Sequence, residues 1–498
     1  AVRGLLTYPY GCAEQTTSTA YPHVFIDEAA AKQFGLKAYT PAQRAEMLDK
    51  AIGRLVSLQA ANGGFSLWGN LSEYQYWLSA YVGHFLLDAR EQGFTVPAEM
   101  EKKTTDFLLR GLQEGVAGMP RTSPTPGEQG MWADSRYAGA GRFGVLAYGA
   151  YVLARQGKAP LATLRTLADA SAQAHSGLAL VHLGLALKLM GDEARSQTAI
   201  ADGLKTQRRN AGWWGDYGSN LRDWAQMYVL LDKHGLKPEG RENLVGLVAA
   251  EVEKNRYLST QEKLSLFLLG RSFAVPQAGE KAAEWGAELI PGGKAAAAQR
   301  LGGQGTQFLP LAGGELAAGM VLKNTHRERL FVELNYAGNP AKAPAARRDT
   351  FDVTRRWYTA DGQLLGKRAL RVGESLVVRV NVKTRGRVVN GLVVDYVPAG
   401  VEIENANLAQ GEQNALLVDG VEIRSAMQDS RIKHTEFRDD RFVVAARLEG
   451  QNDFFYRVRV VTPGSFVVPP TYVEDMYQPM VYGLAGGGEL ITINEGRE

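Results

Sequence analysis

The chain has 498 residues and a formal net charge of +3, with 45% hydrophobic and 22% charged residues. At roughly 150 residues per domain, this length predicts about three domains, and the composition is typical of globular rather than disordered chains. Lys and Arg form only short pairs, such as Arg208-Arg209, so we expect no nucleic-acid partner. No apolar run reaches 18 residues, so we expect no transmembrane helix. The single cysteine, Cys12, excludes an internal disulfide and a cysteine-rich zinc site.

The first part of the chain, to about residue 300, has the apolar periodicity of helices. The clearest block covers residues 41–58, where Thr40 is a suitable N-cap and Pro41 occupies the first helical position. Its apolar residues fall on one helical face. Similar blocks cover residues 77–87, 143–154, 178–190, 224–231 and 264–269.

A weak internal repeat connects these helices. Residues 58–69 and 206–215 both combine a helix end, an Asn/Gly turn and an aromatic residue that leads into the next helix. Repeated helical hairpins need neighbours to bury their apolar faces, and a closed ring provides them. The alternative is an unrelated helical array.

Beyond about Gln304 the pattern changes to that of strands. Leu376, Val378, Val380 and Val382 alternate with residues 377, 379, 381 and 383, and several further short apolar runs follow, separated by turn signals. Such spacing favours a β-sandwich. A segment rich in Pro, Ala and Gly, residues 337–346, has the composition of a linker. We therefore expect a helical domain over 1–303, a small β segment with a linker over 304–346, and a sandwich over 347–498.

The chemistry of Cys12 depends on its neighbours. Gly11 permits a tight backbone before Cys12, and Gln15 lies three residues later, which on the first turn of a helix brings two side chains close together. Loss of ammonia from Gln15 would join Cys12 Sγ to Gln15 Cδ as an internal thioester, without a cofactor or a metal. Glu14 either positions this site or favours the helix N-terminus. The alternative is a cysteine that is only a small buried apolar residue.

Residues 11–15, Gly-Cys-Ala-Glu-Gln, resemble the thioester motif of the α-2-macroglobulin and complement family. The wider stretch, Tyr8 to Thr17, is most similar to bacterial α-2-macroglobulins, as are residues 436–442, 461–466 and 474–479. The resemblance extends over essentially the whole chain. It implies an α/α toroid that carries the thioester, the last part of a CUB-like β domain, and a macroglobulin-like β-sandwich.

The resemblance also implies how the thioester reacts and how it is protected. In complement relatives a downstream His receives the acyl group, but residues 122–137, where it is expected, contain no His. We therefore expect direct attack by amines, mainly Lys side chains. Tyr10 is a candidate for local cover, and Met476 and Tyr477 are candidates for a lid that shields the bond from water.

The expected function is that of a single-use protease trap rather than an enzyme with turnover. The family implies target proteases as partners and a penicillin-binding protein as a further one. It also implies a periplasmic location, with membrane attachment through a lipidated N-terminus that this sequence lacks. Because the chain does not begin with Met, we expect it to be part of a longer protein. Two alternatives are a toroidal enzyme acting on a polysaccharide or terpenoid and a thioester adhesion module.

Overall fold

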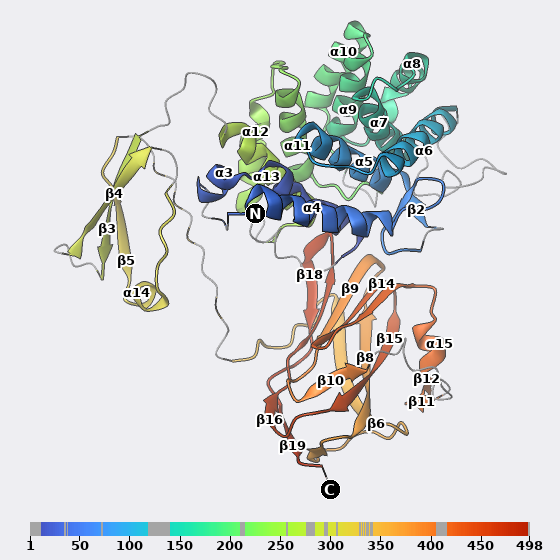
Figure 1. Cartoon of the computed structure of the whole chain (residues 1–498), viewed down its shortest axis with the longest axis vertical. Coiled ribbons are helices and arrows are strands. Elements are labelled where there is room, and N and C mark those ends of the chain that lie inside the picture. Colours follow the sequence, from blue (N-terminus) through green and yellow to red (C-terminus); the bar gives the residue numbers. More distant parts are fainter. Residues whose placement is uncertain are drawn as a thin grey trace. The chain divides into compact units, whose positions relative to one another are not determined.

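The structure is a computed structural model of the whole chain. It describes residues 11–33, 36, 38–70, 73–117, 140–209, 215–254, 257–274, 284–292, 297–304, 307–327, 330, 332, 334, 338, 342–404 and 416–496. The chain divides into two compact units, the first formed by residues 1–255 and 260–335 and the second by residues 256–259 and 336–498. Each unit is described by itself (Figure 1).

The first unit is built mainly from helices, which the sequence periodicity predicted. In chain order they are α2 Ala13–Phe25, α3 Glu28–Gln33, α4 Pro41–Val56, α5 Tyr76–Glu91, α6 Ala98–Ala117, α7 Ala140–Ala154, α8 Leu161–Asp169, α9 Gly177–Leu189, α10 Glu193–Lys205, α11 Asn220–Lys233, α12 Asn243–Lys254 and α13 Thr260–Ala274. A short β-hairpin, β1 Phe65–Ser66 with β2 Tyr74–Gln75, precedes α5.

The helices form a closed ring with two layers. Helices α2, α5, α7, α9, α11 and α13 each pack on the next, and α13 returns to α2. Helices α4, α6, α8, α10 and α12 pack outside them. The inner helices α5 and α9 are buried on nearly every side, whereas the outer helix α4 buries only Leu48, Ile52 and Leu55. This layering follows from composition, because a helix that is apolar all round requires partners on every side. The predicted α/α toroid is confirmed.

Helix α4 shows how local sequence sets an element boundary. The Thr40 hydroxyl accepts the Gln43 backbone N–H, and the Gln43 side chain accepts the Thr40 N–H, which together form a capping box. Pro41 follows at the first helical position, as predicted.

Strands begin earlier than the sequence suggested. A three-stranded antiparallel sheet, ordered β4-β3-β5, consists of β3 Glu284–Pro291, β4 Gln299–Gln304 and β5 Met320–Asn324, with the short helix α14 Gly313–Ala317 before β5. The expectation that strands start beyond Gln304 is therefore wrong. Within this sheet β4 carries no strand signal, because it is exposed along almost its whole length and contains Gly302-Gly303, so it has no apolar alternation.

The second unit is the predicted β-sandwich. One sheet has the order β10-β15-β8-β6 and the other β13-β14-β9-β17-β18, with a small third sheet β16-β19-β7. Their core consists of apolar residues from both large sheets, among them Val378, Val393 and Phe442. The strands are β6 Phe351–Thr359, β7 Leu370–Arg371, β8 Ser375–Thr384, β9 Val388–Tyr396, β10 Val401–Glu404, β13 Ile432–Phe437, β14 Arg441–Leu448, β15 Gln451–Val460, β16 Gly464–Val467, β17 Thr471–Asp475, β18 Gln478–Leu484 and β19 Leu490–Asn494.

The outer face of β8 departs from simple alternation. Val377 lies on the strand face opposite Val378, as expected, and on that face it is buried with Tyr358, Val418 and Phe455 in a second, smaller cluster. The cover comes from a small hairpin, β11 Leu417–Val418 with β12 Val421–Glu422, and from α15 Ile423–Met427. An added covering element therefore makes both faces of the strand apolar at this point.

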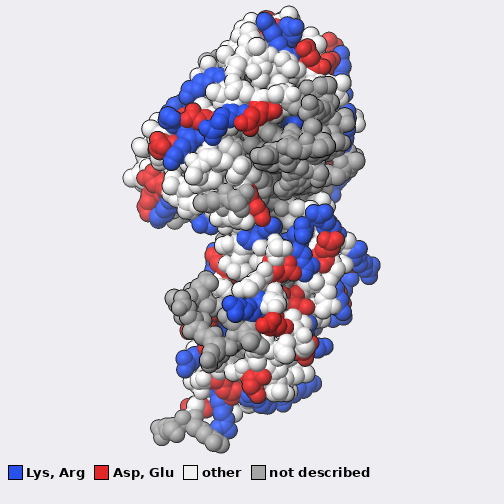
Figure 2. Space-filling view, turned by 90° about the vertical axis from the view of Figure 1, so that its right-hand side faces the viewer, with Lys and Arg blue, Asp and Glu red and all other residues white. Residues whose placement is uncertain are grey.

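The surface carries both signs of charge. On the face shown in Figure 2, Lys and Arg residues alternate with Asp and Glu and with uncharged residues, and the described part of this face has no extended patch of one sign. Among the described residues, no helix combines the length and the apolar character needed to cross a membrane.

Candidate functional site

Cys12 and Gln15 lie at the start of helix α2. Cys12 is the N-cap residue in an extended conformation, and the Gln15 backbone N–H donates to Cys12 Sγ over 3.4 Å. Both residues are buried, with 0% and 1% of their surface exposed. The predicted placement of this pair on the opening turn of a helix is confirmed. The thioester itself remains a prediction.

The start of α2 is fixed by one backbone hydrogen bond to a neighbouring segment and by one within the helix itself. The Ala13 N–H donates to the Leu67 carbonyl over 2.9 Å, and the Thr16 N–H donates to the Cys12 carbonyl over 2.8 Å. At Gly11 a Cβ would meet no described atom within 4 Å, and its φ lies outside the left-handed region. As far as the described residues show, neither close packing nor backbone conformation requires glycine at position 11.

Glu14 is the best-held side chain of the motif. It is fully buried, and its carboxylate accepts Ser18 Oγ at 2.6 Å, Thr260 Oγ1 at 2.9 Å and Gln261 Nε2 at 2.7 Å. The Tyr81 hydroxyl shares a 2.7 Å hydrogen bond with Ser18. Burial, reinforced by the nearby Glu14 carboxylate, raises the pKa of Tyr81 well above its usual range, so its hydroxyl stays protonated. These hydrogen bonds fix the Glu14 side chain, and its role in the site stays a prediction.

The sequence did not reveal these partners. Thr260 and Gln261 lie at the start of α13, more than 240 residues after Glu14. No local motif connects the two segments. Only the prediction of a closed ring, in which the last helix returns to the first, could have indicated that they meet.

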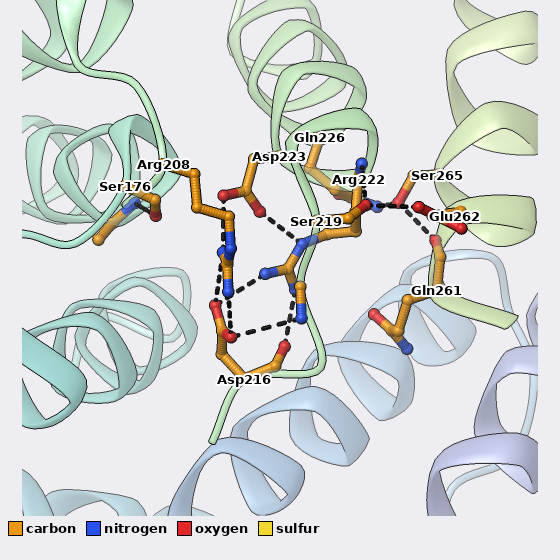
Figure 3. Close-up of polar contacts among 12 residues, drawn as sticks. Ser176, Arg208, Asp216, Ser219, Arg222, Asp223, Gln226, Gln261, Glu262 and Ser265 are labelled. Atoms are coloured by element: carbon orange, nitrogen blue, oxygen red, sulfur yellow. Dashed lines mark hydrogen bonds and ion pairs between the residues drawn. The ribbon is translucent and has the colours of Figure 1, made fainter. Parts of the chain in front are cut away.

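A second buried polar cluster lies at the start of α11, close to α13 (Figure 3). Arg208 and Arg222 both pair with Asp216 and with Asp223 at 2.5–2.9 Å. Burial alone would raise the pKa of Asp216, but Arg208 and Arg222 outweigh it and hold that pKa well below its usual range. His175 Nε2 lies 3.1 Å from the same carboxylate. Mutual pairing of this kind favours a structural role.

The helical ring surrounds a cavity of about 420 Å³. Its lining includes the carboxylates of Asp88 and Asp216, and an enzyme built on a helical ring would need such carboxylates as an acid/base pair. Lys233, Arg155 and His84 surround Asp88, and together they outweigh burial and hold its pKa below its usual range. Both carboxylates are therefore ionised and paired with cations, whereas a general acid needs a raised pKa.

The remaining predicted site residues are Tyr10, Met476 and Tyr477. Tyr10 and residues 122–137 fall outside the described residues. Met476 and Tyr477 form the turn between β17 and β18 in the second unit. The Met476 N–H donates to the Asn390 carbonyl over 3.0 Å, and the Tyr477 N–H donates to Asp475 Oδ1 over 3.1 Å. The lid remains a prediction.

Comparison with known proteins places this geometry in a family. The chain is similar to the crystal structure of native α-2-macroglobulin from Escherichia coli spanning domain MG7 to the C-terminus, with a TM-score of 0.85 and 36% identity, and the match covers 99% of this chain and 74% of that one. The chain belongs to the bacterial α-2-macroglobulin family. The model described as "A-macroglobulin TED domain" matches residues 1–122, and "Bacterial Alpha-2-macroglobulin MG10 domain" matches residues 351–479. These matches confirm the family resemblance and the fold class.

Curated relatives are longer than this chain. An α-2-macroglobulin from Xylella fastidiosa (strain Temecula1) is 39% identical over 492 residues, and one from Escherichia coli K12 is 36% identical over 500 residues. The matches cover 97% and 99% of this chain but 29% of each relative. A Salmonella α-2-macroglobulin crystallised after reaction with methylamine has a TM-score of 0.84 and 34% identity, over 99% of this chain and 30% of that chain.

Proposed function

We propose that this chain is the reactive part of a protease trap in which a thioester between Cys12 and Gln15 acylates Lys amines of the captured protease. The observation that carries the proposal is the burial of this one Cys–Gln pair on the first turn of α2, with the Gln15 N–H donating to the Cys12 sulfur. The reaction of the similar Salmonella protein with methylamine, a small amine, gives support from a relative.

The chemistry balances without a cofactor. In formation, the Cys12 sulfur bonds to Gln15 Cδ, the C–N bond breaks, and ammonia leaves with the thiol proton. In capture, an amine nitrogen bonds to Cδ, the C–S bond breaks, and the amine proton passes to the sulfur. The products are one amide and one thiol, so each chain acts once.

Two features of the site suit this chemistry. The N-terminus of α2 presents the Gln15 backbone N–H toward the sulfur, which stabilises a departing thiolate. Burial of both residues limits access of water, which would otherwise hydrolyse the bond.

The lid belongs to the same proposal. We propose that Met476 and Tyr477 shield the thioester in the resting protein. The double variant Met476→Ala/Tyr477→Ala should then shorten the half-life of the thioester in water. An unchanged half-life would contradict the lid.

The family resemblance supports three further proposals for the longer protein: target proteases as covalent partners, a penicillin-binding protein as an additional partner, and a periplasmic location with a lipidated anchor. A thioester adhesion module is the second candidate function, because it shares the same pair of residues. Preference for protein amines over sugar hydroxyls separates the two. The ion pairing of Asp88 and Asp216 disfavours a toroidal enzyme.

Intact mass and thiol titration test the proposal directly. We expect the chain to be lighter by one ammonia, to show no reactive thiol, and to gain one methylamine and one thiol after treatment, with the adduct on Gln15. Cys12→Ser serves as the control and should gain no methylamine. A wild-type chain of full mass with unmodified Gln15, also within the longer protein, would contradict the trap mechanism.

A further inference from the structure

The carboxylate of Glu14 joins the two ends of the helical ring. Glu14 is on α2, the first inner helix, and its partners Thr260 and Gln261 are on α13, the last inner helix. Ser18 completes the set from α2 itself, one turn after Glu14. We call Glu14, Ser18, Thr260 and Gln261 the ring clamp.

The ring clamp is costly to disturb because its centre is a buried carboxylate. Glu14 has 0% of its surface exposed, and Thr260 and Gln261 have 3% each. A buried carboxylate needs hydrogen bonds from its surroundings to replace those from water. The clamp supplies them from two hydroxyls and one amide, at 2.6–2.9 Å, and hydrogen bonds to a charged acceptor are the stronger kind. The position of α13 therefore determines where the Glu14 carboxylate rests.

Glu14 lies between the two reacting residues on the same helical turn. The Cys12 side chain and the Gln15 backbone are already connected across this turn by the 3.4 Å contact between Sγ and N. A shift of Glu14 toward or away from α13 thus changes the geometry of both neighbours. Reactions that need two groups held together are sensitive to displacements of about 1 Å, which can cost about 100-fold in rate.

We propose that Thr260 and Gln261 are positioning residues for the thioester, acting through Glu14, an inference that rests on the proposed function. Their side chains hydrogen-bond to Glu14 and Ser18. They hold the opening turn of α2 in the register that brings Cys12 Sγ to Gln15 Cδ. The reactive pair near the start of the chain thereby depends on a segment about 245 residues later.

A purely structural role would give a different result, and the chain offers a matched control. Ser265 lies one turn further along α13, is fully buried, and accepts a 3.0 Å hydrogen bond from Gln226 Nε2 on α11 (Figure 3). Ser265→Ala removes this bond between two inner helices and the 2.8 Å hydrogen bond from the Ser265 hydroxyl to the Gln261 backbone carbonyl. It leaves every hydrogen bond to the Glu14 carboxylate in place. Substitutions at Ser265 and in the ring clamp should therefore both lower the stability of the ring. Only substitutions in the ring clamp should also disturb the position of the thioester.

Four variants of the whole chain test the positioning role: Gln261→Glu, Glu14→Gln, the double exchange Glu14→Gln/Gln261→Glu, and Ser265→Ala. Gln261→Glu places a second carboxylate against that of Glu14. The double exchange restores a pair of one carboxylate and one amide, with the two groups on the opposite helices. The readouts are the fraction of chains that take up one methylamine at Gln15 and the melting temperature. We expect Gln261→Glu to lower that fraction at least about tenfold, the double exchange to recover most of it, and Ser265→Ala to leave it within about twofold.

The outcomes separate the two claims. Two results would overturn the positioning role and leave the trap intact. One is that Gln261→Glu keeps the wild-type thioester content. The other is that Ser265→Ala loses as much thioester as Gln261→Glu at an equal fall in melting temperature. Failure of the double exchange to recover methylamine uptake despite a wild-type melting temperature would also overturn it. A wild-type chain that takes up no methylamine would overturn the proposed function and this inference together.

Discussion

The Cys12 sulfur meets the start of α2 at a point where backbone N–H groups have no partner within the helix. These groups favour negative charge on the sulfur and therefore make the thiolate a better leaving group. Burial protects the thioester bond, but it also disfavours a free thiolate on Cys12. The N-terminus of α2 offsets this cost when the C–S bond breaks. Reactivity here follows from the position of the residue, because cysteine itself is common as an inert buried residue.

Gly144 on inner helix α7 lies at a tightly packed point of the ring. A Cβ at this position would lie 2.1 Å from His175 Cε1, and His175 is buried and hydrogen-bonded to Asp216, so it has little room to move. We expect Gly144→Ala to lower the free energy of unfolding by about 1–3 kcal/mol, measured by urea denaturation.

The matched control for Gly144 is Gly246 on outer helix α12, where a Cβ would meet no described atom within 4 Å. Gly246→Ala should leave stability unchanged or raise it by roughly 0.5–1 kcal/mol, since alanine is the better helix former. If both variants behaved alike, the tight packing at His175 would be refuted.

At the scale of elements, Asp395 joins the two large sheets of the sandwich. It lies on β9 with 0% exposure and accepts Arg355 of β6 at 2.6 Å, Tyr456 of β15 at 2.7 Å and Thr471 of β17 at 2.7 Å. Asp395→Ala leaves the guanidinium of Arg355 buried without its counter-charge. We expect a loss of about 3–5 kcal/mol of stability, measured by hydrogen exchange of β6 and β9 in urea.

Tyr456→Phe is a milder substitution among the partners of Asp395. It removes one hydroxyl donor but keeps the ion pair between Arg355 and Asp395. We expect a loss of about 1 kcal/mol. An equal effect of the two substitutions would show that the charge pair contributes little beyond its hydrogen bonds.

Elements were predictable from sequence where local signals set them. Thr40 and Gln43 mark the start of α4, and the alternation through Val378 and Val380 marks β8. By contrast, β4 is a polar, exposed strand whose formation depends on pairing with β3, so its own residues carry no signal. The partners of Glu14 were missed for a related reason, because contacts between distant segments exist only after the ring closes.

At the scale of the whole molecule, the helical ring buries several titratable groups around its cavity. His84 is surrounded by Tyr148 at 3.0 Å, by Asp88 at 3.6 Å and by the cations Arg155 and Lys233. Burial lowers the pKa of His84 to about 3, against the opposing effect of Asp88. Burial also lowers the pKa of two further histidines of this region, that of His234 to about 4 and that of His182 well below its usual value.

These shifts make the stability of the ring depend on pH. In the unfolded chain a histidine binds a proton below a pKa of about 6.5, while folded His84 stays neutral down to about 3. The unfolded state therefore gains protons first as the pH falls, and stability declines from about pH 6.5 downward by up to about 1.4 kcal/mol per pH unit for each such histidine. The decline attributable to His84 ends near its folded pKa of about 3.

Substituting His84 measures how much of this loss of stability at low pH comes from His84. Between pH 7 and pH 5 the fall in unfolding free energy should be smaller by about 2 kcal/mol in His84→Asn than in the wild-type chain, because one proton-binding group has been removed from the unfolded state. Urea denaturation followed by tryptophan fluorescence at both pH values measures the difference. An equal pH dependence in wild type and His84→Asn would mean that folded His84 binds its proton as readily as the unfolded chain does, and that burial in the ring is offset by Asp88.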